Sequence, residues 1–321
     1  MPCLAEGAAD KSGFSFEAIV NHMLRPCTYS IIFLLIGLSW SSSALADMRV
    51  DAGRGPVTVN VPPSYDPDRP LPLLFFLHGY TSSGQRAENY VRLRALADEL
   101  EFIYVHPDGR ENWWGSRFWD ATDACCKFID SNGDDVEYLS ALSDSIRSAL
   151  SVDASRIYFF GHSNGGFMAY RMACEKSAWV SAVASLAGAA WADAAQCAPA
   201  NPVAVLQIHG TEDQVIRFAG GTILFRRYPS ANETVAGWAR MNRCPSTPTL
   251  RDSLDLLSSR AGSETVVSAY ADCEPGGDTE LWTMRGAGHS PELGRSFSRQ
   301  VVEWLLRHAK AEEPGLEARG E

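Results

Sequence analysis

Short apolar runs alternate along this chain with longer segments of helical periodicity. Residues 71–77 read LPLLFFL, and such an unbroken apolar run is typical of a strand covered on both faces of its sheet. Residues 134–150 carry apolar side chains at helical spacing and predict a helix. Further strands are expected at residues 57–61, 102–106, 156–160, 180–187, 203–208 and 280–284, and further helices at residues 87–100 and 295–309. The alternation predicts an α/β fold with a mostly parallel central sheet and helices on both faces.

A different hydrophobic pattern marks the N-terminus. Residues 23–46 combine the basic Arg25, an apolar stretch over residues 29–40 and a small-residue end at Ala46. This is the layout of a signal peptide cleaved near Ala46, which predicts a secreted protein, extracellular or periplasmic. The alternative is a buried core helix, and the stretch is shorter than the roughly 20 residues of a membrane span. Residues 1–22 are then expected to come from a start codon assigned too early.

Residues 47–310 are expected to form a single domain, because no linker rich in Pro, Gly and Ser interrupts them, and residues 311–321 a loose polar tail. The formal net charge of −11 argues against nucleic acid as a partner and against a membrane surface for the mature form. Asn232 lies in an Asn-x-Thr sequence, which is a glycosylation acceptor only in a eukaryotic host.

The sequence Gly161-His162-Ser163-Asn164-Gly165 follows an expected strand and precedes an apolar helix. A bare G-x-S-x-G is common as a simple tight turn, but strand, turn and helix together are typical of a nucleophile elbow. There the serine has a positive φ that projects its hydroxyl above the sheet, and the glycines let the two backbones approach. We expect Ser163 to be a nucleophile and His162 to pack beside it or beside a substrate.

A serine nucleophile needs a base, and the base needs an acid to orient it. Asp213 follows an apolar strand, as the acid of this fold does, and Glu212 is its alternative. His289 lies in the glycine-rich loop GAGHSPE before the last helix and is the expected base. A structural hydrogen bond is expected for His209, and a surface position for His308.

The oxyanion of acyl transfer requires two N–H donors. The residue after the nucleophile, Asn164, supplies one in this fold, and the loop after an early strand supplies the other. Here that loop reads His78-Gly79-Tyr80, so the backbone N–H of Tyr80 is the expected second donor.

Residues 107–128 are rich in aromatic side chains. Trp113, Trp114 and Trp119 are expected near the carboxyl edge of the sheet, where aromatic rings suit a phenolic ester or a polymer. Packing within a loop is the alternative for all three. Asp134 and Asp135 are expected to cap the helix that follows.

In combination, LHGY, WDATDACC, GDDV, GHSNGGFMAYRMAC, HGTEDQVI and GAGHS resemble the secreted esterases grouped with polyhydroxybutyrate depolymerases and feruloyl or acetylxylan esterases. The resemblance covers about residues 55–308. It implies an α/β-hydrolase fold, hydrolysis of carboxylic esters through an acyl-enzyme, and no metal or cofactor. It also implies Ser163, Asp213 and His289 as the triad, with Tyr80 and Asn164 at the oxyanion positions.

Two departures bear on the substrate. Many polyester-cleaving members have tryptophan and proline closely after the catalytic histidine, where this chain has Ser290-Pro291-Glu292, and a cysteine where it has Tyr80. Feruloyl or acetyl esters of plant polysaccharide, or related aryl esters, are therefore favoured. A polyester depolymerase, a peptidase or acyltransferase on the same fold, and a non-catalytic hydrolase-like binding protein are the alternatives.

Six cysteines follow the leader, which in an exported protein predicts up to three disulfides: Cys125, Cys126, Cys174, Cys197, Cys244 and Cys273. Metal binding is the alternative, but no CxxC motif accompanies them. The resemblance implies that Cys244 pairs with Cys273. The other four are left without an assigned pairing, except that the adjacent Cys125 and Cys126 are not expected to bond to each other. Cys125 and Cys126 are each expected to form a disulfide with Cys174 or Cys197.

Overall fold

The computed structural model describes residues 47–126, 134–245 and 247–310, all of which belong to one compact unit, Ser43–Glu321. The expected leader, residues 1–46, and the expected tail, residues 311–321, lie outside the described residues.

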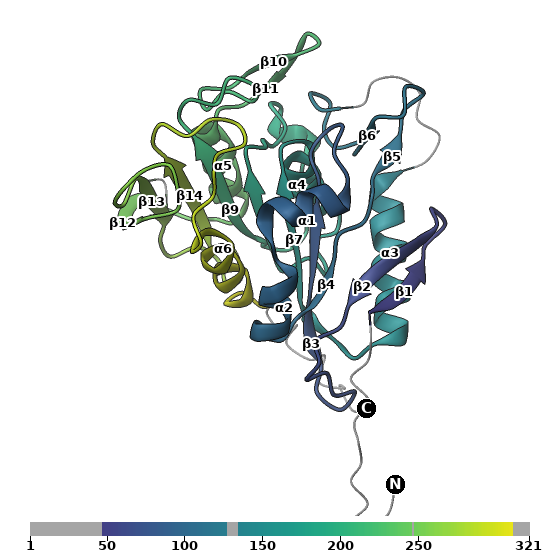
Figure 1. The fold of residues 1–321 in the computed structure, drawn as a ribbon. Helices are drawn as coiled ribbons and strands as arrows, with labels where there is room; N and C mark the ends of the chain where they lie inside the picture. Colours follow the sequence, from purple (N-terminus) through teal and green to yellow (C-terminus); the bar gives the residue numbers. More distant parts are fainter. Residues whose placement is uncertain (1–46, 127–133, 246, 311–321) are drawn as a thin grey trace, which may run out of the picture. The chain divides into compact units, whose positions relative to one another are not determined.

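A ten-stranded sheet forms the centre of this unit, in the order β1-β2-β4-β3-β7-β8-β9-β14-β13-β12 (Figure 1). The strands are β1 (Met48–Asp51), β2 (Pro56–Asn60), β3 (Leu71–Leu77), β4 (Ile103–Val105), β7 (Val152–His162), β8 (Ala182–Leu186), β9 (Ala204–Gly210), β12 (Thr249–Leu254), β13 (Thr265–Tyr270) and β14 (Thr279–Met284). The six strands from β4 to β14 in this order pair in parallel, and antiparallel strands complete both edges. The mostly parallel sheet predicted from the apolar runs is confirmed.

Helices cover both faces of the sheet (Figure 1). They are α1 (Gly84–Val91), α2 (Arg94–Leu100), α3 (Asp135–Ala149), α4 (Asn164–Glu175), α5 (Ala231–Met241) and α6 (Phe297–Leu306). Successive side chains of a strand point to opposite faces, so β3 contributes to two cores. Leu73 and Phe75 pack with α3 and α4, whereas Leu74 and Phe76 pack with α1, α2 and α6.

The segment expected as one helix over residues 87–100 forms two helices. The chain leaves the helical conformation at Arg92, which has a φ of 55°. The buried carboxylate of Glu88 accepts hydrogen bonds from the N–H groups of Leu93 and Arg94, at 3.1 and 3.0 Å. These bonds satisfy donors at the start of α2 and separate it from α1.

Several short or polar strands lack a signal in the apolar pattern. They are β1 and β12 at the edges of the sheet, and the hairpins formed by β5 (Arg110–Glu111) with β6 (Arg117–Phe118) and by β10 (Gly221–Ile223) with β11 (Arg226–Tyr228). Strand β12 is exposed almost throughout, carries Arg251 and Asp252, and shifts its register on β13 between Leu250 and Asp252. Edge strands are stabilised by one neighbour and need little apolar surface.

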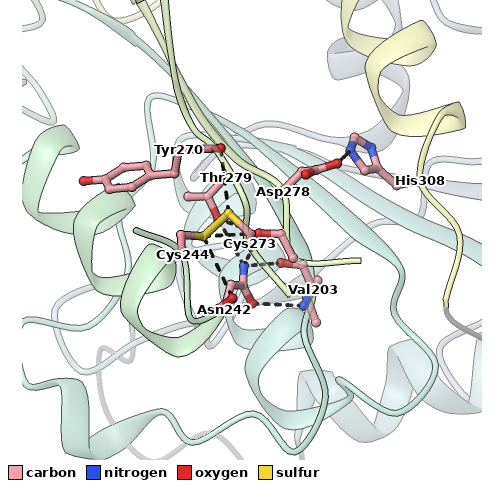
Figure 2. The surroundings of a disulfide bond; sticks show 9 residues. Val203, Asn242, Cys244, Tyr270, Cys273, Asp278, Thr279 and His308 are labelled. Atoms are coloured by element: carbon pink, nitrogen blue, oxygen red, sulfur yellow. Dashed lines mark hydrogen bonds and ion pairs between the residues drawn. A yellow bond between two sulfur atoms is a disulfide. The ribbon is translucent and has the colours of Figure 1, made fainter. Parts of the chain in front are cut away.

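The disulfide pattern corrects one expectation. Cys125 bonds to Cys126, and Cys174 therefore bonds to Cys197. The expectation that adjacent cysteines would not pair, and that each would reach Cys174 or Cys197, was wrong: it rested on the usual disulfide geometry, whereas here the peptide bond between the two is cis and their Cα atoms lie 3.1 Å apart. Cys244 bonds to Cys273, as the resemblance implied, and Figure 2 shows this bridge between the end of α5 and the loop after β13.

Candidate active site

The turn between β7 and α4 has the geometry of a nucleophile elbow. Ser163 has φ 54° and ψ −120°, and its N–H donates to Leu186 O at 2.8 Å. The flanking glycines are required because the backbones are in contact. A Cβ on Gly161 would lie 2.0 Å from Gly165 O, and one on Gly165 would lie 2.0 Å from Leu77 O. The close packing holds Ser163 at the carboxyl end of the central strands.

Three side chains from distant parts of the chain meet at this turn. His289 Nε2 lies 2.9 Å from Ser163 Oγ, and His289 Nδ1 lies 2.7 Å from Asp213 Oδ2. The serine hydroxyl can therefore donate to Nε2 while Nδ1–H donates to the carboxylate. The structure brings together the three residues that the sequence singled out as nucleophile, base and acid.

The Asp213 carboxylate is fully buried and accepts several hydrogen bonds. Its Oδ1 accepts the N–H groups of Val215 and Ile216, at 2.8 and 2.9 Å. Burial alone would raise the pKa of the Asp213 carboxyl, but the nearby imidazoles of His209 and His289 and the N–H of Val215 outweigh burial. The pKa of Asp213 is therefore held well below its ordinary value, and the group stays ionised. The neighbouring Glu212 is exposed and takes no part in these contacts.

Behind Asp213 lies a buried, hydrogen-bonded chain of polar side chains. It starts on α4, the helix that follows Ser163. The Tyr170 hydroxyl donates to Gln207 Oε1 at 2.6 Å, and Gln207 Nε2 donates to His209 Nδ1 at 2.9 Å. His209 Nε2–H then donates to Ile216 O at 2.7 Å and lies 3.4 Å from Asp213 Oδ2. The orientation of each group fixes the next, so His209 accepts at Nδ1 and donates from Nε2. The structural hydrogen bond expected for His209 is present, and it supports the acid loop.

The loop after β3 passes directly beside Ser163. A Cβ on Gly79 would lie 3.3 Å from the Cβ of Ser163, so the backbone of Gly79, the residue before Tyr80, lies next to the serine. On the other side, the Asn164 side chain accepts from Trp119 N at 2.7 Å and donates to Trp119 O at 2.9 Å. Asn164 is thereby fixed in the first turn of α4, where its backbone N–H points out of the helix start.

A pocket of about 280 Å³ opens onto Ser163 and His289. Its wall includes Tyr80 and His162, as well as Arg86 and Tyr90 of α1, which the sequence reasoning missed. Arg86 and Tyr90 are four residues apart and share one helix face. In the sequence, this spacing in a helix that follows the loop after β3 was the signal that could have identified them as pocket residues.

His162 positions the loop of the expected base. Burial lowers the pKa of His162 to about 4, so the ring is neutral near pH 7. Its Nε2–H donates to the backbone carbonyl of His289 at 3.0 Å, and its ring also packs against Tyr90. His162 therefore supports the loop that carries His289.

The three candidate tryptophans differ in position. Trp119 is fully buried and donates from Nε1 to His78 O at 3.0 Å, which gives it a packing role instead of contact with substrate. Trp113 and Trp114 lie at the tip of the β5–β6 hairpin with exposed fractions of 81% and 69%, and neither lines the pocket. The hairpin is joined to the loop after β3 by a bond from Thr81 N to Arg117 O at 2.8 Å.

Other predicted residues lie away from the pocket. His308 is buried rather than on the surface, because its ring contacts Trp304 O at 2.8 Å and Asp278 Oδ2 at 3.0 Å (Figure 2). Asp134 caps α3 as expected, by accepting from Val136 N at 2.9 Å. In the described residues, no group of three or more His, Cys, Asp or Glu could hold a metal ion. None of the helices described above is long and apolar enough to cross a membrane.

Comparison with known proteins agrees with this geometry. The protein is 28% identical over 246 residues to feruloyl esterase D of Neurospora crassa, which covers 73% of each chain. It is 26% identical over 255 residues to feruloyl esterase B of Piromyces equi, covering 76% of this chain and 45% of that protein. It is 30% identical over 182 residues to a probable feruloyl esterase C of Aspergillus niger, covering 54% of this chain and 61% of that protein. The aligned part is thus less than two thirds of the latter two relatives.

Solved structures share the fold at low sequence identity. An acetyl xylan esterase from Aspergillus awamori superposes with a TM-score of 0.56 at 14% identity, covering 81% of this chain and 99% of that one. An S-formylglutathione hydrolase from Agrobacterium tumefaciens superposes with a TM-score of 0.50 at 16% identity, covering 83% and 94%. The family described as Phospholipase/Carboxylesterase matches residues 64–238, more than half of the 321-residue chain. The chain therefore belongs to the phospholipase/carboxylesterase family and has the α/β-hydrolase fold.

Proposed function

We propose that this protein is a secreted serine carboxylesterase that works through an acyl-enzyme intermediate. One observation carries the proposal: Ser163, His289 and Asp213 form a continuous hydrogen-bonded chain in the wall of a pocket. Family membership and the esterase relatives support it.

In the first half of the reaction, Ser163 Oγ attacks the carbonyl carbon of the ester while its proton moves to His289 Nε2. The carbonyl oxygen becomes an oxyanion. The N–H groups of Tyr80 and Asn164 bind it, and the N-terminal end of α4 adds a favourable dipole. His289 then gives the proton to the alcohol oxygen, the C–O bond breaks, and the acyl group stays on Ser163.

In the second half, water repeats the attack on the acyl-enzyme. His289 accepts the water proton and returns it to Ser163 as the acid leaves, so one ester and one water give one acid and one alcohol. The ionised Asp213 stabilises the imidazolium that forms in both halves.

Feruloyl or acetyl esters of plant polysaccharide, or related aryl esters, are the substrates we favour. Feruloyl esterases are among the similar proteins. A pocket of about 280 Å³ with Tyr90 in its wall is suited to a single aromatic or acyl group. Secretion through the expected signal peptide would bring the enzyme to such polymers.

A polyester depolymerase is the second candidate, favoured by the exposed Trp113 and Trp114. The residues after His289 argue against it, because Ser290-Pro291-Glu292 lacks the aromatic side chain of many polyester-cleaving members.

Labelling with a fluorophosphonate probe tests the mechanism, and it distinguishes an esterase from a non-catalytic binding protein. We expect stoichiometric labelling of Ser163 and no labelling of Ser163→Ala. The variant should lose activity by a factor on the order of 10⁴ or more. Retention of more than a tenth of the wild-type rate would contradict the assignment. A panel of aryl esters, feruloylated oligosaccharides, polyester films and peptides then separates the substrate classes.

A further inference from the structure

A second and larger hollow adjoins the catalytic pocket. This groove of about 570 Å³ lies between α1 and the loop after His289, and it shares Tyr90 and Ser290 with the pocket. The Tyr90 hydroxyl donates to Pro291 O at 2.9 Å, which ties α1 to that loop where pocket and groove meet. The two hollows therefore adjoin each other at Tyr90 and Ser290, and Ser163 lies in the smaller one.

Their sizes suit different parts of an ester. Sites that enclose a drug-sized ligand measure roughly 300–1,000 Å³. The catalytic pocket, at about 280 Å³, holds one small group, whereas the groove has room for a larger one. An ester that fills both has a compact acyl group and a bulkier alcohol, or the reverse.

The position of His289 indicates whether the acyl part or the alcohol part of the ester enters the groove. In serine hydrolysis the histidine returns its proton to the departing alcohol oxygen, so the alcohol leaves on the histidine side. The groove begins at Ser290, Pro291 and Glu292, directly after His289. The alcohol part therefore faces the groove, and the acyl part faces the pocket.

The net charge of the residues that line the pocket and the groove is opposite in sign to that of the whole chain. Arg86 lines the pocket, and Arg92 and Arg295 line the groove, while Glu292 is the single carboxylate among the residues of both. The three arginines are exposed and none forms an ion pair among the described residues. In a chain of net charge −11 this excess of positive charge is local.

Another hollow in the molecule shows the contrast. The cavity of about 250 Å³ beside α5 is also lined by two arginines, Arg227 and Arg240, but a carboxylate lies among them, since Glu233 lines the same cavity and pairs with Arg227 at 2.8 Å. Arg92 and Arg295 keep their donors available for a ligand carboxylate, which a guanidinium can bind through two parallel hydrogen bonds.

We propose that the groove binds the alcohol part of a carboxylate-bearing ester, such as a saccharide that carries a uronic acid. The proposal rests on the proposed esterase function and names its substrate class. Arg92 and Arg295 bind the carboxylate, and the acyl group next to the ester bond occupies the catalytic pocket.

Two feruloylated xylo-oligosaccharides that differ only in a glucuronate side group provide the test. We expect the wild-type protein to have a KM about threefold to tenfold lower for the acidic oligosaccharide, because each exposed arginine contributes modestly. The preference should disappear in Arg92→Gln/Arg295→Gln. For the wild-type protein it should become smaller in about 0.5 M NaCl, because salt screens the charges. Arg251→Gln/Arg285→Gln is the matched control, since both arginines are exposed and line neither hollow, and it should retain the preference.

Three other results would contradict the proposal. Equal KM values in the wild-type protein, or a preference that survives in Arg92→Gln/Arg295→Gln, would overturn the proposal, and so would its loss in the control. Circular dichroism and thermal melting establish that the variants fold. Failure of the esterase function itself is recognised separately, because the wild-type protein would then hydrolyse neither oligosaccharide nor 4-nitrophenyl acetate.

Discussion

His209 and His289 approach the same oxygen of Asp213. His289 Nδ1 lies 2.7 Å from Oδ2, and His209 Nε2 lies 3.4 Å from it on the buried side. The expected acid is thus held between an imidazole that faces the pocket and one that faces the core. In the proposed mechanism the imidazole of His209 exchanges no proton with the substrate, and it limits where the carboxylate can lie.

Replacement of His209 should therefore reduce turnover without weakening substrate binding. In His209→Ala, the acid loop loses the bond to Ile216 O, and small displacements in a catalytic site are costly. We expect kcat to fall by about tenfold to a hundredfold with KM nearly unchanged. His209→Gln, whose amide can donate near the position of Nε2, should recover part of the loss. Steady-state kinetics on a soluble aryl ester, with melting curves for both variants, provide the measurement. A kcat for His209→Ala within twofold of wild type would exclude the positioning role.

The two histidines near the C-terminus should separate activity from stability. His289→Ala should lose activity by roughly the same factor as Ser163→Ala, because the nucleophile then has no base. His308→Ala should keep its kcat but unfold more easily, by about 1–3 kcal/mol, because the buried ring of His308, just after the end of α6, loses its bonds to Trp304 O and Asp278. Urea unfolding and aryl-ester kinetics distinguish the two effects. The assignment of the base would be wrong if His308→Ala were the inactive variant.

The lowered pKa of His162 should make the folded protein less stable as the pH falls below neutral. Its pKa in the folded protein is about 4, compared with 6.5 for the ordinary group, because burial disfavours the charged ring beside His289 and Tyr90. Between these values the unfolded chain binds a proton that the folded chain does not, so stability decreases as the pH falls from 6.5 toward 4. His162→Gln removes this contribution.

Urea midpoints at about pH 7 and pH 4.5 test the effect. The midpoint of the wild-type protein should fall more over this interval than that of His162→Gln. Because Asp213 has a lowered pKa, its own contribution is lost only at still lower pH and does not interfere. Equal decreases in both proteins would show that His162 titrates alike in the folded and unfolded states.

Trp113 and Trp114 should matter on polymers and not on small esters. Exposed tryptophans at a hairpin tip can bind a saccharide or polymer surface, and these two do not line the pocket. We expect Trp113→Ala/Trp114→Ala to release acid from an insoluble feruloylated polysaccharide several times more slowly, with an unchanged rate on methyl ferulate. Phe225→Ala, at the exposed tip of the β10–β11 hairpin, is the control. Equal rates on the polymer would assign the pair no role in adsorption.

The Cys244–Cys273 bridge should contribute to stability and not to catalysis. It joins the end of α5 to the loop after β13 across a sequence separation of 29 residues (Figure 2). The double variant Cys244→Ala/Cys273→Ala should lose roughly 3 kcal/mol of unfolding free energy and retain its kcat. Denaturant unfolding measures the loss. A non-reducing peptide map should also contain Cys174 linked to Cys197, and Cys125 with Cys126 oxidised within one peptide. Free thiols at these positions would contradict the observed pairing.

The sequence was informative wherever a local signal fixed the structure. The apolar run of β3 and the glycines around Ser163 each specify one arrangement, because neither a polar side chain nor a Cβ can be accommodated there. For Asp213 and His289 the order along the chain, together with the strand before each loop, was enough to select them over Glu212 and His308.

What could not be predicted depends on contacts between distant segments. The break at Arg92 results from the carboxylate of Glu88, which is an unremarkable helix residue in the sequence. The exposure of Trp113 and the burial of Trp119 depend on how one loop packs on Asn164. Cysteine spacing likewise contains no information about the peptide bond between Cys125 and Cys126.

Strand β12 has a consequence for the behaviour of the protein in concentrated solution. An unpaired strand at the border of a sheet invites a second molecule to extend the ladder, which is a common route to aggregation. Here the border carries Arg251 and Asp252, and the shift in register at Leu250 interrupts the regular row of donors and acceptors. A neighbouring molecule would have to bury these charges to dock against an irregular edge. Strand β12 therefore disfavours edge-to-edge assembly of the sheets.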